Sequence, residues 1–327
     1  KHKPFPKLDN MLTLFLILKK PSIPLREFFV RSFSFLIFST AFGLLALCVS
    51  GKAEAQVAMP SLFASARAEE AAPIPQDGVV RIAPHRAVYN MALASAKNGC
   101  NVADVSGRMT FEWRDVCDGW AIQQRLQLHF GYADGEDQNL ASSELTWESK
   151  DGKNYTFNIR RTTDGQETEA YRGKAVQNSD GTATATYSIP EGKTAKLPAG
   201  TLFPSAHTKL ILQEAVKGEK FFIRHVFDGS DEDGSSDISA FIHPKRPLGN
   251  HPELKAKKKK NPLLVDAAWP VHLAFFKIKS ETGEPDYEMD MNLLPNGVAQ
   301  HMNIDYGDFA VTGNLEEASA LQTQKCP

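Results

Sequence analysis

Two histidines are the residues of this chain that hydrolytic chemistry would use. Pro84-His85-Arg86 places an imidazole beside a guanidinium where an alternating apolar segment begins, and His207 lies further along the chain. A hydrolase would need one of them in a pocket with a nucleophile and an orienting carboxylate. The chain has no G-x-S-x-G motif, no phosphate-binding P-loop and no H-E-x-x-H motif. A structural role is favoured for His85, and the sequence predicts a protein that is not an enzyme.

Acidic residues offer two further patterns that could bind a cation or move a proton. The stretch 228–234 is rich in aspartate, but it lacks the alternating ligands and the closing glutamate of an EF-hand loop, so an exposed acidic turn is favoured. Glu288 and Asp290 fall on one face of a strand, where a solvated face is favoured over a catalytic carboxylate pair. No cysteines show C-x-x-C zinc spacing. We expect no metal ion and no cofactor.

Four cysteines define the possible redox chemistry. Cys48 lies within an N-terminal apolar run, which leaves Cys100, Cys117 and Cys326 in the rest of the chain. In an exported protein, an odd number predicts one disulfide with one free thiol, or a contact with another chain. The spacing alone does not choose among the three possible pairings.

The N-terminal segment has the composition of a targeting signal. An almost uncharged apolar run at 32–50 follows several basic residues and precedes two A-x-A sites, an order typical of a secretory signal peptide. A permanent membrane anchor is the alternative, since the run is about long enough to span a bilayer. The Ala-rich, Pro-containing stretch that follows favours cleavage. We expect 1–10, which precede Met11, to be an over-extended gene start, and 11–68 to be the signal peptide and a flexible leader.

Apolar and polar residues alternate from about residue 80 onward, as residues 108–114 illustrate. Dipeptides such as Asp151-Gly152 and Asn296-Gly297 mark tight turns between such segments. Period-two alternation is typical of half-buried antiparallel strands, and many short strands joined by tight turns form a sheet that curls or closes. The sequence predicts a single all-β domain over 79–327: a spiral or broken, partly open antiparallel β-barrel.

One segment departs from this rhythm and predicts the main α-helix. Residues 203–217 carry apolar side chains at helical spacing, with Pro204 near the start and Gly218 just beyond the end. Ser205 is a candidate N-cap. A lone helix in a β protein usually plugs an open barrel end or covers a sheet face, so we expect this helix to pack against the sheet.

A polar insert interrupts the strand pattern at 243–262. It contains four prolines and a lysine run: Lys255, Lys257, Lys258, Lys259 and Lys260. A solvated loop is the favoured interpretation. The alternative is that these lysines form a contact surface for anionic lipid head groups or another acidic polymer. The formal net charge of −2 argues against a nucleic-acid partner.

Several motifs recur in an order that resembles the EipB-like cell-envelope integrity family of periplasmic proteins. They cover essentially the whole chain after the leader: Pro84-His85-Arg86-Ala87-Val88-Tyr89, Gly107-Arg108-Met109, Cys117-Asp118-Gly119-Trp120, Glu148-Ser149-Lys150-Asp151-Gly152, Gly200-Thr201-Leu202-Phe203-Pro204, Phe227-Asp228-Gly229-Ser230 and Asp305-Tyr306-Gly307-Asp308-Phe309. The resemblance implies a broken β-barrel wrapped around a helix, a periplasmic location and a disulfide that corresponds here to Cys117–Cys326. Cys100 and the lysine-rich insert stand outside the family pattern.

Two functions follow from this resemblance and from the missing catalytic motifs. The first is a non-enzymatic periplasmic protein that supports cell-envelope integrity and stress resistance through contacts with another periplasmic or envelope protein. The alternative is a carrier of lipid or lipoprotein acyl chains in a cavity between sheet and helix. Lipid or an anionic envelope polymer is a further possible partner. A continuous apolar cavity under 203–217 would favour the carrier, whereas a tightly packed interior would favour the first function.

Overall fold

The computed structural model describes residues 80–247, 261, 263–265, 267–278, 283–322 and 326. All of these residues belong to one of the two compact units into which the chain divides. The gene start expected at 1–10, the leader expected at 11–68 and the lysine run of the insert lie outside the described residues.

The first half of the fold is an antiparallel meander in which each strand pairs with the next along the chain. Its strands are β1 (His85–Ala96), β2 (Val102–Asp115), β3 (Gly119–Tyr132), β4 (Gln138–Ser149), β5 (Asn154–Thr163), β6 (Gln166–Gln177), β7 (Ala183–Ile189) and β8 (Thr194–Leu197). Asp164 (φ 50°) and Gly165 (φ 79°) form the two-residue turn between β5 and β6. Positive φ at both positions is what a type I′ hairpin turn requires.

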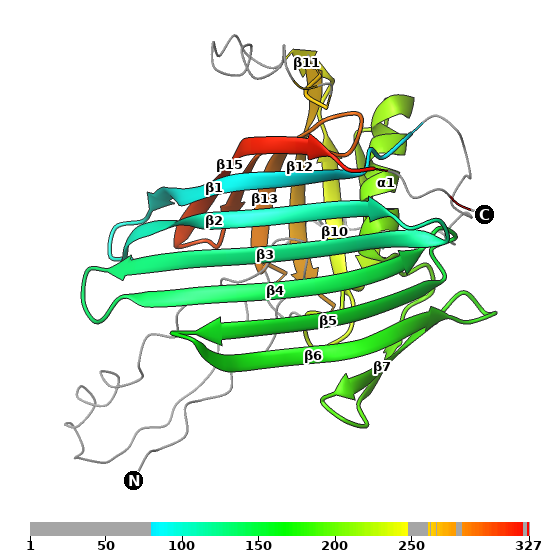
Figure 1. Cartoon of the computed structure of the whole chain (residues 1–327), viewed down its shortest axis with the longest axis horizontal. Helices are drawn as coiled ribbons and strands as arrows, with labels where there is room; N and C mark the ends of the chain where they lie inside the picture. The colour runs from blue at the N-terminus through cyan, green and yellow to red at the C-terminus, as the bar shows by residue number, and fades with distance from the viewer. Residues whose placement is uncertain are drawn as a thin grey trace, which may run out of the picture. The chain divides into compact units, whose positions relative to one another are not determined.

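The second half begins with α1 (Pro204–Lys217) and continues as another antiparallel meander. Its strands are β9 (Phe221–Val226), β10 (Ser236–Ile242), β11 (Arg246–Pro247), β12 (Ala267–Lys277), β13 (Tyr287–Leu293), β14 (Ala299–Asp305) and β15 (Phe309–Ala320). The short β11 pairs with β12 beside the main path of the sheet. The last strand, β15, pairs with β1, so both halves belong to one 15-stranded sheet (Figure 1).

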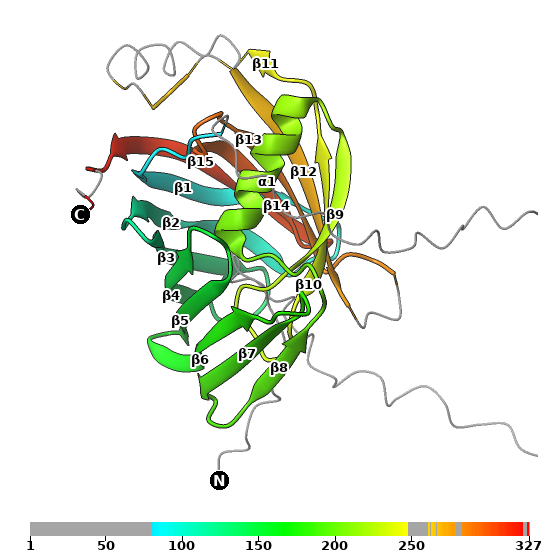
Figure 2. The same cartoon turned by 90° about the vertical axis from the view of Figure 1, so that its right-hand side faces the viewer.

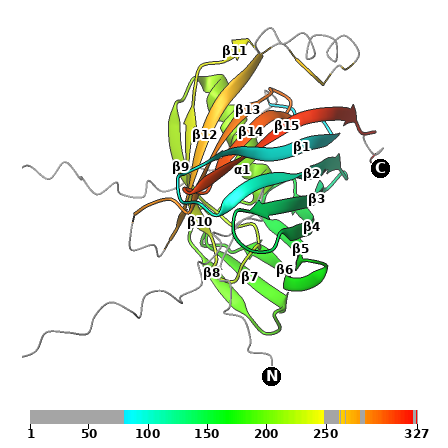
Figure 3. The same cartoon turned by 90° about the vertical axis from the view of Figure 1, so that its left-hand side faces the viewer.

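The sheet curls but does not close, because β8 and β9 remain at its two ends (Figures 2 and 3). Leu202, in the connection from β8 to α1, forms a parallel bridge with Val226 at the end of β9. Its N–H donates to the His225 carbonyl at 2.8 Å, and its own carbonyl accepts from the Phe227 N–H at 3.0 Å. The prediction of an all-β, broken and partly open antiparallel barrel with one main helix is confirmed.

Helix α1 lies along the concave side of the sheet (Figure 2). It buries Leu210, Ile211 and Leu212 in the core, and it ends before Gly218, whose φ of 82° gives the left-handed C-cap that glycine favours. The expected N-cap was wrong: the capping position is Phe203, which forms no side-chain cap, while Ser205 lies inside the first turn. Over the part of the chain that is described, no helix has the length and apolarity needed to cross a membrane.

The alternation of apolar and polar residues places the large apolar side chains of the early strands on the concave face of the sheet. Met109, Phe111 and Trp113 on β2 are all buried, and His85 on β1 stands directly opposite Trp113. A second, smaller cluster of aromatic rings packs around Tyr155 and includes Phe157, Tyr187, Phe203 and Phe227. Phe203 stacks on Tyr155 with ring centroids 5.0 Å apart. The start of α1 is therefore held in place by aromatic packing as well as by its covalent connection to β8.

Candidate functional site

A small cavity lies between α1 and the concave face of the sheet. The space open to the centre of a water molecule is about 50 Å³, which is room for a few water molecules. Most of its wall is apolar and comes from α1 and from strands of both halves, including Phe111, Ile211, Ile238, Phe275, Met289 and Met291. The cavity therefore resembles an incompletely filled core beneath the helix.

Three buried nitrogen atoms at this cavity have no hydrogen-bond partner among the described residues. They are Nε2 of His85, Nε2 of His207 and Nε1 of Trp113. His85 Nδ1 lies 2.7 Å from the Ala83 carbonyl, and a carbonyl oxygen can only accept, so the His85 Nδ1–H is the donor. In the neutral ring, Nε2 of His85 is then an unused acceptor, whereas the Trp113 Nε1–H is an unused donor.

Burial keeps both imidazoles uncharged. It lowers the pKa of His207 to about 4, with a smaller contribution from the nearby Arg224 guanidinium. Burial also lowers the pKa of His85, against the opposing effect of its hydrogen bond to Ala83. Neutral rings at pH 7 can accept or donate a hydrogen bond, but they supply no positive charge for an anionic group.

The cavity brings together the two histidines that a hydrolase would use, but not a complete catalytic arrangement. Its lining, drawn from the described residues, contains Thr208 and Asp228 but neither serine nor cysteine. The Thr208 hydroxyl donates to the Pro204 carbonyl at 3.0 Å, within the first turn of α1. Within the described part of the chain, no three histidine, cysteine or acidic side chains are grouped to hold a metal ion.

A buried carboxylate on β4 holds the start of the helix over this cavity. The two oxygens of Glu148 accept from the backbone N–H groups of Ser205 and Ala206, at 2.7 and 2.9 Å. These are the unpaired amides of the first helical turn, where a negative charge is also favoured by the helix dipole. Burial raises the pKa of Glu148 to about 7, although both amides act to lower it. Sequence reasoning missed this contact, which joins positions 57 and 58 residues apart.

A buried ionic cluster that includes Arg161 lies next to the aromatic group around Tyr155. Arg161 is buried, pairs with the Glu169 carboxylate, and donates to the Ser230 carbonyl at 3.1 Å. Burial raises the pKa of Glu144 and of Asp231 to about 7, and Arg161 opposes the shift in both.

The acidic stretch 228–234 differs from its prediction. An exposed acidic turn was expected, but Asp228, Ser230 and Asp231 are buried. The Asp228 carbonyl accepts from the Tyr155 hydroxyl at 2.8 Å, so the backbone of this loop satisfies polar groups of the core. The acidic pattern cannot show this, because burial depends on side chains far away in the sequence.

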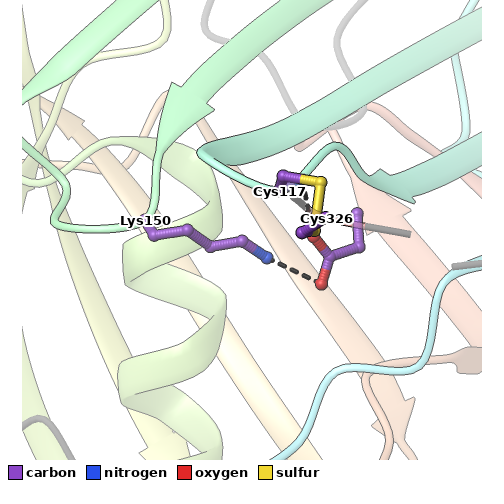
Figure 4. The surroundings of a disulfide bond; sticks show 4 residues. Cys117, Lys150 and Cys326 are labelled. Carbon is purple, nitrogen blue, oxygen red and sulfur yellow. Dashed lines mark hydrogen bonds and ion pairs between the residues drawn. A yellow bond between two sulfur atoms is a disulfide. The ribbon is translucent and has the colours of Figure 1, made fainter. Parts of the chain in front are cut away.

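A disulfide ties the turn between β2 and β3 to the segment after β15. Cys117, in the turn between β2 and β3, and Cys326 are joined with an S–S distance of 2.12 Å and a Cα–Cα distance of 5.5 Å (Figure 4). Beside them, Lys150 Nζ forms a 2.9 Å ion pair with the Asp115 carboxylate, drawn as a dashed line from Lys150 in Figure 4. The same ammonium group lies over the ring of Trp120. The structure thus brings together the two cysteines that the resemblance pairs. Cys100 is a half-buried free thiol.

The remaining candidate residues lie apart from the cavity. Glu288 and Asp290 flank His272 on an exposed strand face, at 3.4 and 3.0 Å from its ring nitrogens. The lysine run proposed as a contact surface lies outside the described residues.

Comparison with known proteins finds a matching family model, a relative and a solved structure. A family model described as EipB-like matches residues 76–322. The cell envelope integrity protein EipB of Brucella abortus (strain 2308) is 28% identical over 248 residues, covering 75% of this chain and 87% of that protein. A crystal structure of a beta-barrel-like protein with a domain of unknown function, also from Brucella abortus, matches with a TM-score of 0.68 at 28% identity. That match covers 74% of this chain and all of the other.

Proposed function

This chain belongs to the EipB-like family, and from that membership we propose that it is a non-enzymatic periplasmic protein that supports cell-envelope integrity. The observation that carries the proposal is the match over 76–322 together with the relative known as a cell envelope integrity protein. In this proposal the protein increases resistance to envelope stress through contacts with another periplasmic or envelope protein.

Two features of the chain support this location and role. A disulfide between Cys117 and Cys326 suits an oxidising compartment such as the bacterial periplasm, and the N-terminal segment has the order of a signal peptide.

Deletion of the gene tests the proposed role. We expect the deletion strain to lose viability on bile salts or detergent, and expression of the intact chain to restore it. Crosslinking in intact cells, followed by mass spectrometry, should then recover an envelope protein joined to this chain. Normal survival of the deletion strain under every envelope stress would contradict the role in envelope integrity. Recovery of the chain without any crosslinked protein would contradict the partner contacts alone.

Transport of an acyl chain is the second candidate, because the mainly apolar cavity lies beneath α1. A volume of about 50 Å³ means that α1 would have to move away from the sheet before a lipid could enter. Lipid extraction of the purified protein, followed by mass spectrometry, should recover a bound lipid, and Ala299→Phe in the cavity wall should abolish it. Ser188→Phe at an exposed position is the control. Protein free of lipid after gentle purification would eliminate this candidate.

A further inference from the structure

The two edge strands of the open sheet differ in what they expose. β8 is four residues long and carries an exposed Lys196, and short strands bearing lysine protect an edge from pairing. β9 has six residues, and two side chains on its outward face are large, apolar and exposed: Phe221, 47% exposed, and Ile223, 49% exposed. β9, at the other end of the sheet order (Figure 2), is longer and exposes large apolar side chains, although Lys220 before it and Arg224 within it are charged.

The register of β9 shows which of its backbone groups are available. The Lys220 carbonyl accepts from the Ile242 N–H at 2.9 Å, so Lys220 and every second residue after it point their backbone groups toward β10. Phe221 and Ile223 consequently point theirs away from the sheet. His225 is the next residue whose backbone groups point away from the sheet, and its carbonyl already accepts from the Leu202 N–H at 2.8 Å. Among the described residues, no backbone group pairs with the outer edge at Phe221 and Ile223, but the Ile223 carbonyl accepts from Arg224 Nη1 at 2.8 Å. An incoming strand must displace that side-chain hydrogen bond before it can use this carbonyl.

An aromatic pair extends this edge onto the neighbouring strand. Phe241 on β10 stands directly opposite Phe221, with ring centroids 4.5 Å apart, and is 47% exposed. Together with Ile223 they form an exposed apolar group on the face opposite the core. Exposed aromatic side chains of this kind are typical anchors of protein interfaces.

We propose that the outer edge of β9 binds an extended segment of a partner protein, which adds to the sheet as a further strand. This inference rests on the proposed function, in which the chain acts through partner contacts. The segment alternates apolar residues, which cover Phe221, Ile223 and Phe241, with acidic residues on its other face. Those acidic residues pair with Lys220 and Arg224, which lie on the concave side of the strand.

A second copy of this chain is a poorer occupant of the same edge. Two β9 strands can pair antiparallel through the outward backbone groups of Phe221 and Ile223 only if Phe221 stands opposite Ile223 of the second copy. In that register Lys220 of one copy stands opposite Arg224 of the other, since both pairs of positions have the same sum (221 + 223 = 220 + 224). Like charges directly opposite each other destabilise a strand pair. Complementary charge therefore favours an acidic segment of a different protein.

The test uses the full chain and a synthetic seven-residue peptide that alternates glutamate with valine. Its two controls are a copy N-methylated on the amides that would face β9 and a copy with lysine in place of glutamate. We expect the glutamate peptide to bind, measured by fluorescence anisotropy, and to protect the Phe221 and Ile223 amides from hydrogen exchange. N-methylation should weaken binding about tenfold, because it removes strand hydrogen bonds.

Variants of β9 distinguish binding through backbone hydrogen bonds of an added strand from binding through apolar side-chain contacts alone. Ile223→Pro removes an outward N–H, which an edge strand tolerates, and should weaken binding about tenfold, whereas Ile223→Val should not. Phe221→Pro, at the first residue of the strand, replaces Ile223→Pro if that variant does not fold. Lys220→Glu should weaken binding of the glutamate peptide about twofold to fivefold and strengthen that of the lysine peptide.

Several results would overturn the proposal. The glutamate peptide could fail to bind, its N-methylated copy could bind equally well, or the protected amides could lie elsewhere in the chain. The chain could instead self-associate through β9 as its concentration rises, or bind anionic lipid vesicles in competition with the peptide. The deletion strain distinguishes this inference from the proposed function. If Ile223→Pro fully restores stress resistance to that strain, the edge is not the contact, although the role in envelope integrity stands.

Discussion

Removing the Cys117–Cys326 disulfide should destabilise the fold more than any surface change. The bridge joins positions 209 residues apart and therefore encloses β3 to β15 in one covalent loop. A cross-link stabilises a protein mainly by restricting its unfolded chain, and a loop of this length corresponds to about 5 kcal/mol as an upper value. Strain and residual structure in the unfolded chain reduce this figure, so we expect a loss of about 2–5 kcal/mol.

The loss is large enough to measure as a shift in the melting temperature. For a domain of about 150–250 residues, each kcal/mol corresponds to about 2–4 °C, so Tm should fall by about 4–20 °C. The variant is the double substitution Cys117→Ser with Cys326→Ser, because a single substitution would leave a thiol free to pair with Cys100. Thermal unfolding followed by circular dichroism gives Tm with and without reductant.

The control is Cys100→Ser, which removes the half-buried free thiol and leaves the bridge in place. It should unfold near the wild-type temperature, and reductant should lower its Tm as it lowers that of the wild type. Reductant should leave the double variant unchanged. Equal melting temperatures for the double variant and the wild type would refute the reasoning, as would an equal loss in Cys100→Ser.

Other changes test the buried polar groups. Glu148→Ala should lower the free energy of unfolding by about 2 kcal/mol, because two amides of α1 lose their acceptor, and Glu148→Gln should cost less; urea unfolding measures both. Burial raises the pKa of Glu144, Glu148 and Asp231 to about 7, so these three carboxyl groups take up protons on folding between pH 3.8 and 7. The pKa of His207, lowered to about 4, and the lowered pKa of His85 act in the opposite direction below pH 6.5, but three carboxyl groups outweigh two imidazoles, so stability should fall as pH rises through this window. For Glu148 alone, a shift from 4.5 to about 7 is about 3 kcal/mol; a Tm that rises over this range would contradict the assignment. Gly229→Ala should destabilise far more than Gly165→Ala, since both have positive φ but only the Cβ at position 229 would lie 2.4 Å from an aromatic ring carbon.

The sequence was sufficient to predict those strands and helices whose boundaries and buried faces are determined by neighbouring residues. Strand β2 alternates Met109, Phe111 and Trp113 with polar residues, and the structure buries those three side chains as expected. Helix α1 is bounded by Pro204 and Gly218, whose backbone preferences act within a few residues. Such features can be predicted because the physical cause lies in neighbouring residues.

Strand β4 could not be predicted in this way, because there the charged side chains face the core and an apolar side chain faces the solvent. Glu144 and Glu148 are buried, whereas Leu145 between them is 53% exposed. The carboxylates face inward because their partners, Arg161 near one and the amides of α1 at the other, come from elements far along the chain. A hydrophobicity pattern cannot anticipate partners of this kind, so it missed the contact that holds the helix in place.

The path of the chain between β8 and β9 explains why the barrel stays open. These two strands are consecutive in the sequence, yet they stand at opposite ends of the sheet order, and the helix in the segment that joins them lies on the concave side of the sheet (Figure 2). That segment contains α1, whose buried face fills the space inside the curl. Among the described residues of this segment, Leu202, just before the helix, is the one that forms a backbone bridge to β9. The helix thus completes the core while β8 and β9 stay unpaired with each other, which leaves the outer edge at Phe221 and Ile223 where we propose that a further strand adds.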